Sequence, residues 1–141
     1  MFLGTSIHNM DQKGRVILPS KFREELGDTF YVTGGFNRCV QILSSAQFEL
    51  LRDQIRKLPV AKALSLQYLL IANAAQVSPN AQGRIMIPQK LREDAGLSKD
   101  VVVVGMDTRI EIWSKDIYEP FIQKEKEDNI EDALELLSFG G

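Results

Sequence analysis

Two segments of this chain repeat one another. Residues 11–27 align without a gap with residues 80–96. The positions that are identical between them are Gly14/Gly83, Arg15/Arg84, Pro19/Pro88, Lys21/Lys90, Arg23/Arg92, Glu24/Glu93 and Gly27/Gly96. Agreement of this extent indicates an internal duplication, so we expect the chain to fold as two equivalent units. Because there are only two copies, with a period longer than that of common solenoids, we expect one domain with intra-chain pseudo-two-fold symmetry.

Each unit shows the same order of predicted elements. A first strand leads into a glycine-containing loop, and a short β-rich run then ends at a proline that favours a helix start. The helix presents two apolar residues, four positions apart, to the core, and a hairpin follows it. The ranges are strands 15–18 and 84–87, helices 20–26 and 89–95, and hairpin strands 30–33, 39–43, 101–104 and 109–113.

Helical sequence connects the two copies. Ser44 with Gln47 resembles a capping box, and an apolar stripe follows over residues 48–58. Residues 124–141 are acidic with apolar residues at helical spacing, and we expect either a weak amphipathic helix or a frayed end. Of these two alternatives, the composition favours the disordered, frayed end. The predicted organisation is a first unit over 5–47, a helical insert over 48–73, a second unit over 76–119 and an acidic tail over 120–141.

Composition excludes several classes of function. The one cysteine, Cys39, and the one histidine, His8, exclude a disulfide framework and a Cys- or His-rich metal site. The sequence contains no Gly-Lys-Ser/Thr phosphate loop and no convergent pair of acids. We therefore expect no catalytic residue, metal, cofactor or small-molecule substrate, and no enzyme. With no apolar run near the roughly 18 residues of a membrane helix and no secretory leader, we expect a cytoplasmic protein without membrane contact.

Basic residues gather in the repeated segments. The formal net charge is −2, but the C-terminal tail is strongly acidic, and residues 11–23 and 80–92 are each basic. A single charge cluster is usually only solvated surface, whereas the local field decides what docks where. Because both copies carry the cluster at equivalent positions, a shared binding role is favoured.

The repeated loop carries a polar residue four positions before an arginine. Asp11 before Arg15 can accept from loop N–H groups and orient the guanidinium, which suits a phosphate or the edge of a guanine. The alternative is a turn with a surface ion pair that contributes little. The second copy has Asn80 before Arg84, and asparagine can form the turn but cannot pair with a charge. The sequence therefore leaves open whether the two loops have equal roles.

Three motifs resemble those of the MraZ family of bacterial transcriptional regulators, which have two tandem AbrB-like units. They are residues 11–19 (DQKGRVILP), residues 33–39 (TGGFNRC) and residues 82–88 (QGRIMIP). The resemblance runs over about residues 1–121. It implies a mainly β fold with short helices (α+β), arranged as a swapped-hairpin, AbrB-type double-unit barrel. The family's Asp-x-x-x-Arg DNA-binding motif maps onto Asp11 and Arg15, and in the second unit only Arg84 maps cleanly, because Asn80 stands where an aspartate is expected. Together with the basic clusters, this predicts DNA-binding residues Asp11, Lys13, Arg15, Asn80 and Arg84, with the outward-pointing Lys21, Arg23, Lys90 and Arg92 as weaker candidates.

The resemblance also implies partners. Family members form closed rings, for which an octamer is our expectation here. They act, usually as repressors, on the promoter of the division and cell-wall gene cluster, where they bind short direct repeats in double-stranded DNA. The expected location is therefore the nucleoid of the cytoplasm. A competing hypothesis is a ring-forming scaffold whose basic loops hold a protein partner, as AbrB-like antitoxins hold toxins.

Overall fold

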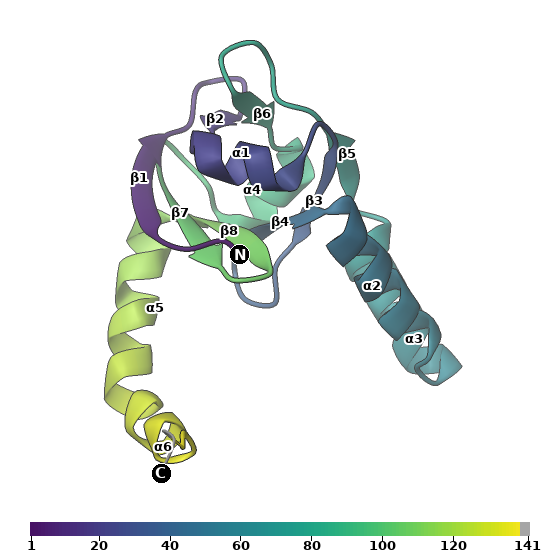
Figure 1. The fold of residues 1–141 in the computed structure, drawn as a ribbon, viewed down its shortest axis with the longest axis vertical. Helices are drawn as coiled ribbons and strands as arrows, with labels where there is room; N and C mark the ends of the chain where they lie inside the picture. Colours follow the sequence, from purple (N-terminus) through teal and green to yellow (C-terminus); the bar gives the residue numbers. More distant parts are fainter. Residues whose placement is uncertain (139–141) are drawn as a thin grey trace.

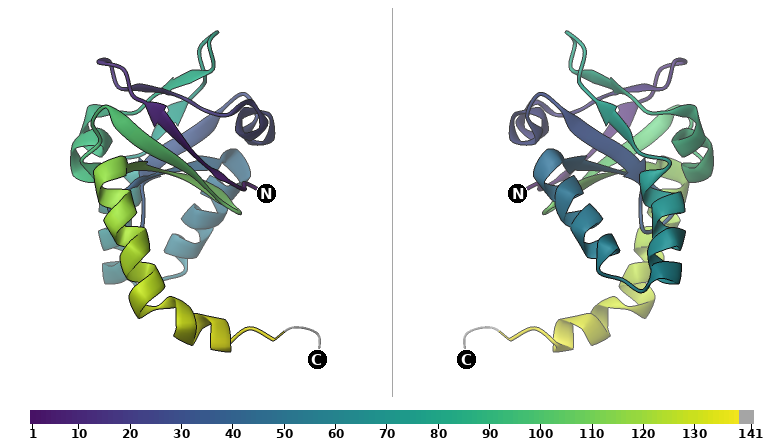
Figure 2. Two further views of the ribbon diagram at one scale, coloured as in Figure 1. Left: turned by 90° about the vertical axis from the view of Figure 1, so that its left-hand side faces the viewer. Right: turned by 90° about the vertical axis from the view of Figure 1, so that its right-hand side faces the viewer.

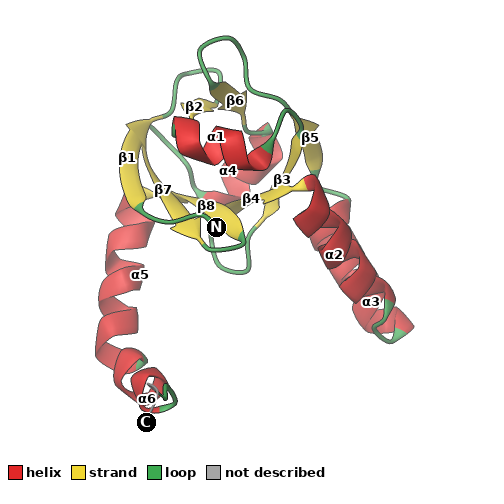
Figure 3. Ribbon diagram, in the orientation of Figure 1, coloured by secondary structure: helices red, strands yellow, loops and turns green. Residues whose placement is uncertain are grey.

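The computed structural model describes residues 1–138, so residues 139–141 of the predicted acidic tail lie outside the described residues. Short helices alternate with short strands along the chain (Figure 3). The strands are β1 (Thr5–Asn9), β2 (Arg15–Ile17), β3 (Phe30–Gly34), β4 (Val40–Ser44), β5 (Ala75–Val77), β6 (Arg84–Met86), β7 (Asp100–Met106) and β8 (Arg109–Ser114). The helices are α1 (Ser20–Leu26), α2 (Ser45–Arg56), α3 (Val60–Leu66), the π-helix η1 (Gln67–Ile71), α4 (Gln89–Ala95), α5 (Lys115–Asp128) and α6 (Ile130–Glu135).

The two units share one six-stranded antiparallel sheet. Its strand order is β1-β7-β8-β4-β3-β5. The first strand of each unit pairs with the hairpin of the other, since β1 pairs with β7 and β5 pairs with β3. The two hairpins meet at the centre, where β4 pairs with β8. Exchanging the equivalent strands of the two units leaves this order unchanged, so neither unit has a sheet of its own.

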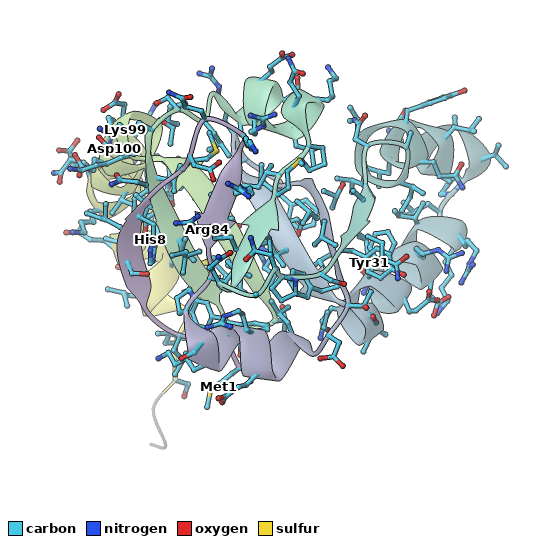
Figure 4. All side chains as sticks on the ribbon, turned by 90° about the horizontal axis from the view of Figure 1, so that it is seen from above. Met1, His8, Tyr31, Arg84, Lys99 and Asp100 are labelled. Atoms are coloured by element: carbon cyan, nitrogen blue, oxygen red, sulfur yellow. The ribbon has the colours of Figure 1, made fainter. Side chains whose placement is uncertain are left out.

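A second, two-stranded sheet lies at one end of the molecule. Strands β2 and β6 pair antiparallel, with Val16 opposite Ile85, and both of these side chains are fully buried. Helices α1 and α4 lie on opposite sides of this ribbon (Figures 2 and 4). Their apolar residues enter one core that draws on both units, and Phe2 packs edge-on against Phe22 at 5.5 Å.

The α+β class with antiparallel strands and short helices is confirmed, whereas the strands of residues 1–138 form no closed barrel. Within residues 1–138, the six-stranded sheet is open, with β1 and β5 at its edges, and the β2–β6 sheet is separate. The reason is that the three-residue strands β2 and β6 pair only with each other, so that they do not join the two edges.

Two helical arms project from the end of the molecule opposite β2 and β6 (Figure 1). One arm is α2, α3 and η1, and it is fixed to the sheet where Phe48 stacks on Tyr31 at 4.2 Å. The other is α5 and α6, fixed where Phe121 packs on Trp113 at 4.6 Å. No helix within the described residues has the length and apolar character needed to cross a membrane.

The preference for a disordered tail is wrong for the described residues, which are helical to Glu135. Side chains one turn apart support this arm, since Gln123 donates to Glu127 at 2.9 Å and Asn129 donates to Glu125 at 3.0 Å. The helical alternative is therefore the one observed. The arm is anchored by the packing of Phe121 on Trp113. Trp113 lies in β8, outside the acidic tail for which disorder was predicted.

Candidate nucleic-acid interface

The loop over residues 11–15, here called the Asp11 loop, is organised by one carboxylate. Asp11 Oδ1 accepts from the backbone N–H of Lys13 at 3.0 Å and from that of Arg15 at 2.8 Å. Its other oxygen, Oδ2, accepts from Arg15 Nε at 2.7 Å. A side chain that bonds to the backbone two residues later forms an Asx turn. The same carboxylate therefore closes the turn and holds the guanidinium of Arg15.

The bonds to Asp11 act on its ionisation. The pKa of the carboxyl lies below its ordinary value of 3.8, chiefly because the Arg15 backbone N–H bonds to the charged form. Partial burial opposes this shift, and the Arg15 side chain and charge reinforce it. Asp11 is therefore an anion at neutral pH, and the Arg15 guanidinium is held in one orientation.

The loop over residues 80–84, here called the Asn80 loop, repeats the turn with a neutral side chain. Asn80 Oδ1 accepts from the backbone N–H of Gln82 at 3.0 Å and from that of Arg84 at 2.9 Å. The turn is thus the same, but an amide carries no charge to hold Arg84. The two loops share a backbone shape and differ in how firmly their arginine is oriented.

The pairing of β2 with β6 brings both arginines to one exposed surface, here called the loop face. Arg15 lies opposite Met86, and Arg84 lies opposite Ile17. Ile17 is 39% exposed and Met86 is 55% exposed. The loop face therefore alternates guanidinium and apolar side chains. The strands β2 and β6 that carry it lie at the end of the molecule away from the helical arms (Figure 1).

Such a surface has the chemistry of a DNA reader. Guanidinium groups bind phosphate oxygens or the O6/N7 edge of guanine, and apolar side chains contact the methyl group of thymine. A two-stranded ribbon is also one of the elements that the major groove of B-DNA admits.

The sequence of this chain matches the model of one known family. A sequence model described as "MraZ protein, putative antitoxin-like" matches residues 1–66 and 70–139. The chain belongs to the MraZ family. Each matched stretch contains one copy of the repeat.

Curated relatives in the MraZ family match over most of their length. The chain is 39% identical over 139 residues to a protein of Caldanaerobacter subterraneus subsp. tengcongensis, covering 97% of this chain and 96% of the relative. It is 38% identical over 142 residues to one of Natranaerobius thermophilus, with 99% of each covered. It is 44% identical over 123 residues to one of Acetivibrio thermocellus, with 86% of each covered. All three are named Transcriptional regulator MraZ, which is not the name of an enzyme class.

The weaker candidates of this MraZ-family chain divide into two kinds. Lys21 and Lys90 are exposed, as expected, and Lys90 pairs with Asp94 at 3.1 Å. The side chains of Arg23 and Arg92 turn toward the opposite loops, and not outward as expected. Their guanidinium groups lie against Gly83 and Gly14 of the opposite loops, because a glycine leaves there the room that a side chain would fill.

Sequence reasoning missed the apolar half of the loop face. Ile17 and Met86 occupy exposed positions of strands whose central residue is buried. The signal was present as alternation, since the residue two positions from each arginine on its strand shares the face of that arginine. Strand pairing was needed to show that the two short strands are neighbours.

His8 and Cys39 take structural positions. The ring of His8, on β1, forms a hydrogen bond with Ser6 Oγ at 2.7 Å. Cys39 is buried, and desolvation raises the pKa of its thiol to about 12, so that it is neutral and unreactive at physiological pH. Within residues 1–138, no group of three or more His, Cys, Asp or Glu side chains could hold a metal ion.

Proposed function

We propose that this chain is a sequence-specific, DNA-binding transcriptional regulator that contacts double-stranded DNA through the loop face. The observation that carries this proposal is that β2 and β6 bring two arginine-bearing loops from distant parts of the sequence to one exposed end. The names of the relatives support a regulatory role. Asp11, Lys13, Arg15, Asn80 and Arg84 are the proposed contact residues.

The two loops are proposed to contribute unequally. Arg15 is already held by Asp11, so that it loses less side-chain freedom on binding than a free arginine, for which the cost reaches about 2 kcal/mol. Asn80, the equivalent residue of the other loop, carries no charge and so does not hold the guanidinium of Arg84. We therefore assign specific contact mainly to the Asp11 loop and supporting phosphate contact to the Asn80 loop.

The finer parts of the proposal concern assembly and target. Two AbrB-like units (residues 5–47 and 76–119), with the insert 48–73 and the tail 120–141, exchange hairpins, which the pairings of β1 with β7 and β5 with β3 support. One chain offers few phosphate contacts, so a ring, with an octamer as our choice, presents many loop faces to direct repeats. The family resemblance supplies the target, which is the promoter of the division and cell-wall genes, with repression as the outcome in the nucleoid.

A second candidate is a scaffold that binds a protein through the same loops. It is favoured by the words "antitoxin-like" in the family description. One pair of measurements, protein capture and DNA binding, distinguishes the two functions. If the purified chain captures an acidic protein and promoter DNA gives no shift, the scaffold hypothesis replaces the proposed one.

The test of the proposed function is fluorescence anisotropy against repeat-bearing and scrambled DNA over a salt series, with the assembly mass measured on the same sample. Arg15→Ala is expected to nearly abolish binding to multi-repeat DNA while the mass is unchanged, because it removes the oriented guanidinium. A matched control is Arg52→Ala, which removes an arginine that is likewise half-buried and paired with a carboxylate, Glu49, but lies on the helical arm α2. Retained affinity of Arg15→Ala, with an unchanged salt slope, would refute the proposal.

A further inference from the structure

Each glycine of the two loops is covered by an arginine of the other unit. A Cβ atom built on Gly14 would lie 2.5 Å from Cζ of Arg92, and one built on Gly83 would lie 2.7 Å from Cζ of Arg23. Both glycines have positive φ, +83° and +78°, which other residues rarely adopt. The positive φ requires glycine at each position, and the guanidinium of the opposite unit occupies the place that a side chain would take.

Backbone bonds cross between the units at the same points. The N–H of Ile87 donates to Gly14 O at 3.0 Å, and the N–H of Leu18 donates to Gly83 O at 3.2 Å. Arg23 Nε also donates to Leu18 O at 3.1 Å, which ties the covering arginine to the strand end that holds the loop. The Asp11 loop is therefore held by the second unit, and the Asn80 loop by the first.

The guanidinium groups of these arginines lie against the opposite loops. Both residues are half-buried, as Arg15 and Arg84 are, so that the contact with Gly14 or Gly83, and not burial, distinguishes them from the proposed contact residues. Arg92 Nε is buried and has no hydrogen-bond partner within the described residues. A guanidinium used as a charge would present its N–H groups to solvent or to an anion, and leaving one buried and unpaired is costly. Its bulk beneath Gly14 is the feature that the fold uses.

We infer that Arg92 and Arg23 are positioning residues that set the opposite unit's DNA-binding loop on the loop face by packing beneath its glycine. Arg92 positions the Asp11 loop, and therefore acts through Arg15. Arg23 positions the Asn80 loop, and therefore acts through Arg84. This inference rests on the proposed function for its effect on DNA, but not for its effect on the loops themselves.

The first test compares two substitutions of Arg92 by anisotropy over a salt series. Arg92→Met keeps length and bulk without charge, and it is expected to weaken binding less than about threefold, whereas Arg92→Ala weakens it about tenfold, roughly 1.4 kcal/mol. Both are expected to leave the salt slope unchanged, because no phosphate contact is lost. If Met and Ala weaken binding alike and each lowers the slope by about 0.9, Arg92 is a phosphate contact and the inference is overturned.

The second test uses the fact that each arginine contacts the loop of the other unit. Arg23→Ala should weaken binding in the wild-type background but by less than about twofold when Arg84→Ala is already present, since both changes remove the same contact. Arg92→Ala, which acts on the other loop, should keep its full effect of about tenfold in the Arg84→Ala background. Effects that add in every combination would contradict positioning through the opposite loop.

A third measurement needs no DNA. Hydrogen exchange is expected to show faster exchange of the Lys13 and Arg15 amides in Arg92→Ala, with the Gln82 and Arg84 amides and the central strands unchanged, and Arg92→Met is expected to resemble the wild type. Uniformly faster exchange, or none at either loop, would overturn the inference. If the exchange result holds and repeat DNA still does not bind the wild type, the proposed function fails while the positioning role stands.

Discussion

At the scale of single residues, the two loops differ by one atom type. Asp11 and Asn80 form the same turn through Oδ1, but only Asp11 has a second oxygen that is charged and bonded to an arginine. The backbone therefore has the same shape in both loops, while the freedom of Arg15 and Arg84 differs. A duplicated sequence has in this way produced two loops that hold their arginine unequally.

The pKa of Asp11 provides a test of which bond matters most. Its carboxyl should titrate below the ordinary 3.8, and Arg15→Ala should raise the midpoint only part of the way, because the backbone N–H of residue 15 is the larger cause and survives the change. Since the folded-state pKa is lowered, the contribution of Asp11 to loop stability is complete above about pH 5 and is lost as the pH falls through the folded value. Carboxyl NMR titration of both proteins measures this, and full return of the midpoint to 3.8 in Arg15→Ala would show that the side chain dominates.

At the scale of elements, the duplication places a serine before each arm. Ser44 precedes α2, and its side chain accepts from the backbone N–H of Gln47 at 3.2 Å. This is the first half of the predicted capping box. Ser114 holds the equivalent position before α5 but makes no side-chain capping bond. Both arms therefore follow a serine, but only Ser44 caps its helix.

Ser44→Ala is expected to lower the free energy of unfolding by about 1 kcal/mol, as the loss of an N-cap does. Ser114→Ala is the matched control and should cost less than half as much, because it removes no cap. Urea unfolding followed by circular dichroism measures both. Equal losses in the two variants would show that burial of the serine, and not capping, accounts for the effect.

At the scale of the whole molecule, the loops and the arms lie at opposite ends. The loop face is basic and is built from both units, whereas the helical arms project away from it and carry the acidic tail (Figure 1). The charge of −2 is therefore an average over two surfaces of opposite character. An acidic chain can in this way present a cationic surface to DNA.

If several loop faces act together, affinity must depend on the number of DNA repeats. DNA with two or more repeats is expected to bind about 10²–10⁴-fold more tightly than DNA with one, since the second contact is made at a high effective concentration. Anisotropy with one-repeat and multi-repeat duplexes of equal length, the spare repeats scrambled, measures the ratio. A ratio near one would mean that each chain binds by itself.

The duplication, the order of elements in each unit and the turn at each loop could be predicted from the sequence, because glycine, proline and side-chain caps act on neighbours a few residues away. The sequence also predicted Arg15 and Arg84 as candidate contact residues, because the same residue type recurs at equivalent positions of the two copies. Only the tertiary structure decided that β1 pairs with β7, that the sheet stays open and that Arg23 and Arg92 turn inward. Helical periodicity shows which face of α1 or α4 is apolar, but a long side chain beside that face goes where there is space. Here the space lies beneath a glycine that is 60 residues away in the sequence from Arg23 and 78 from Arg92, brought close only by the pairing of β2 with β6.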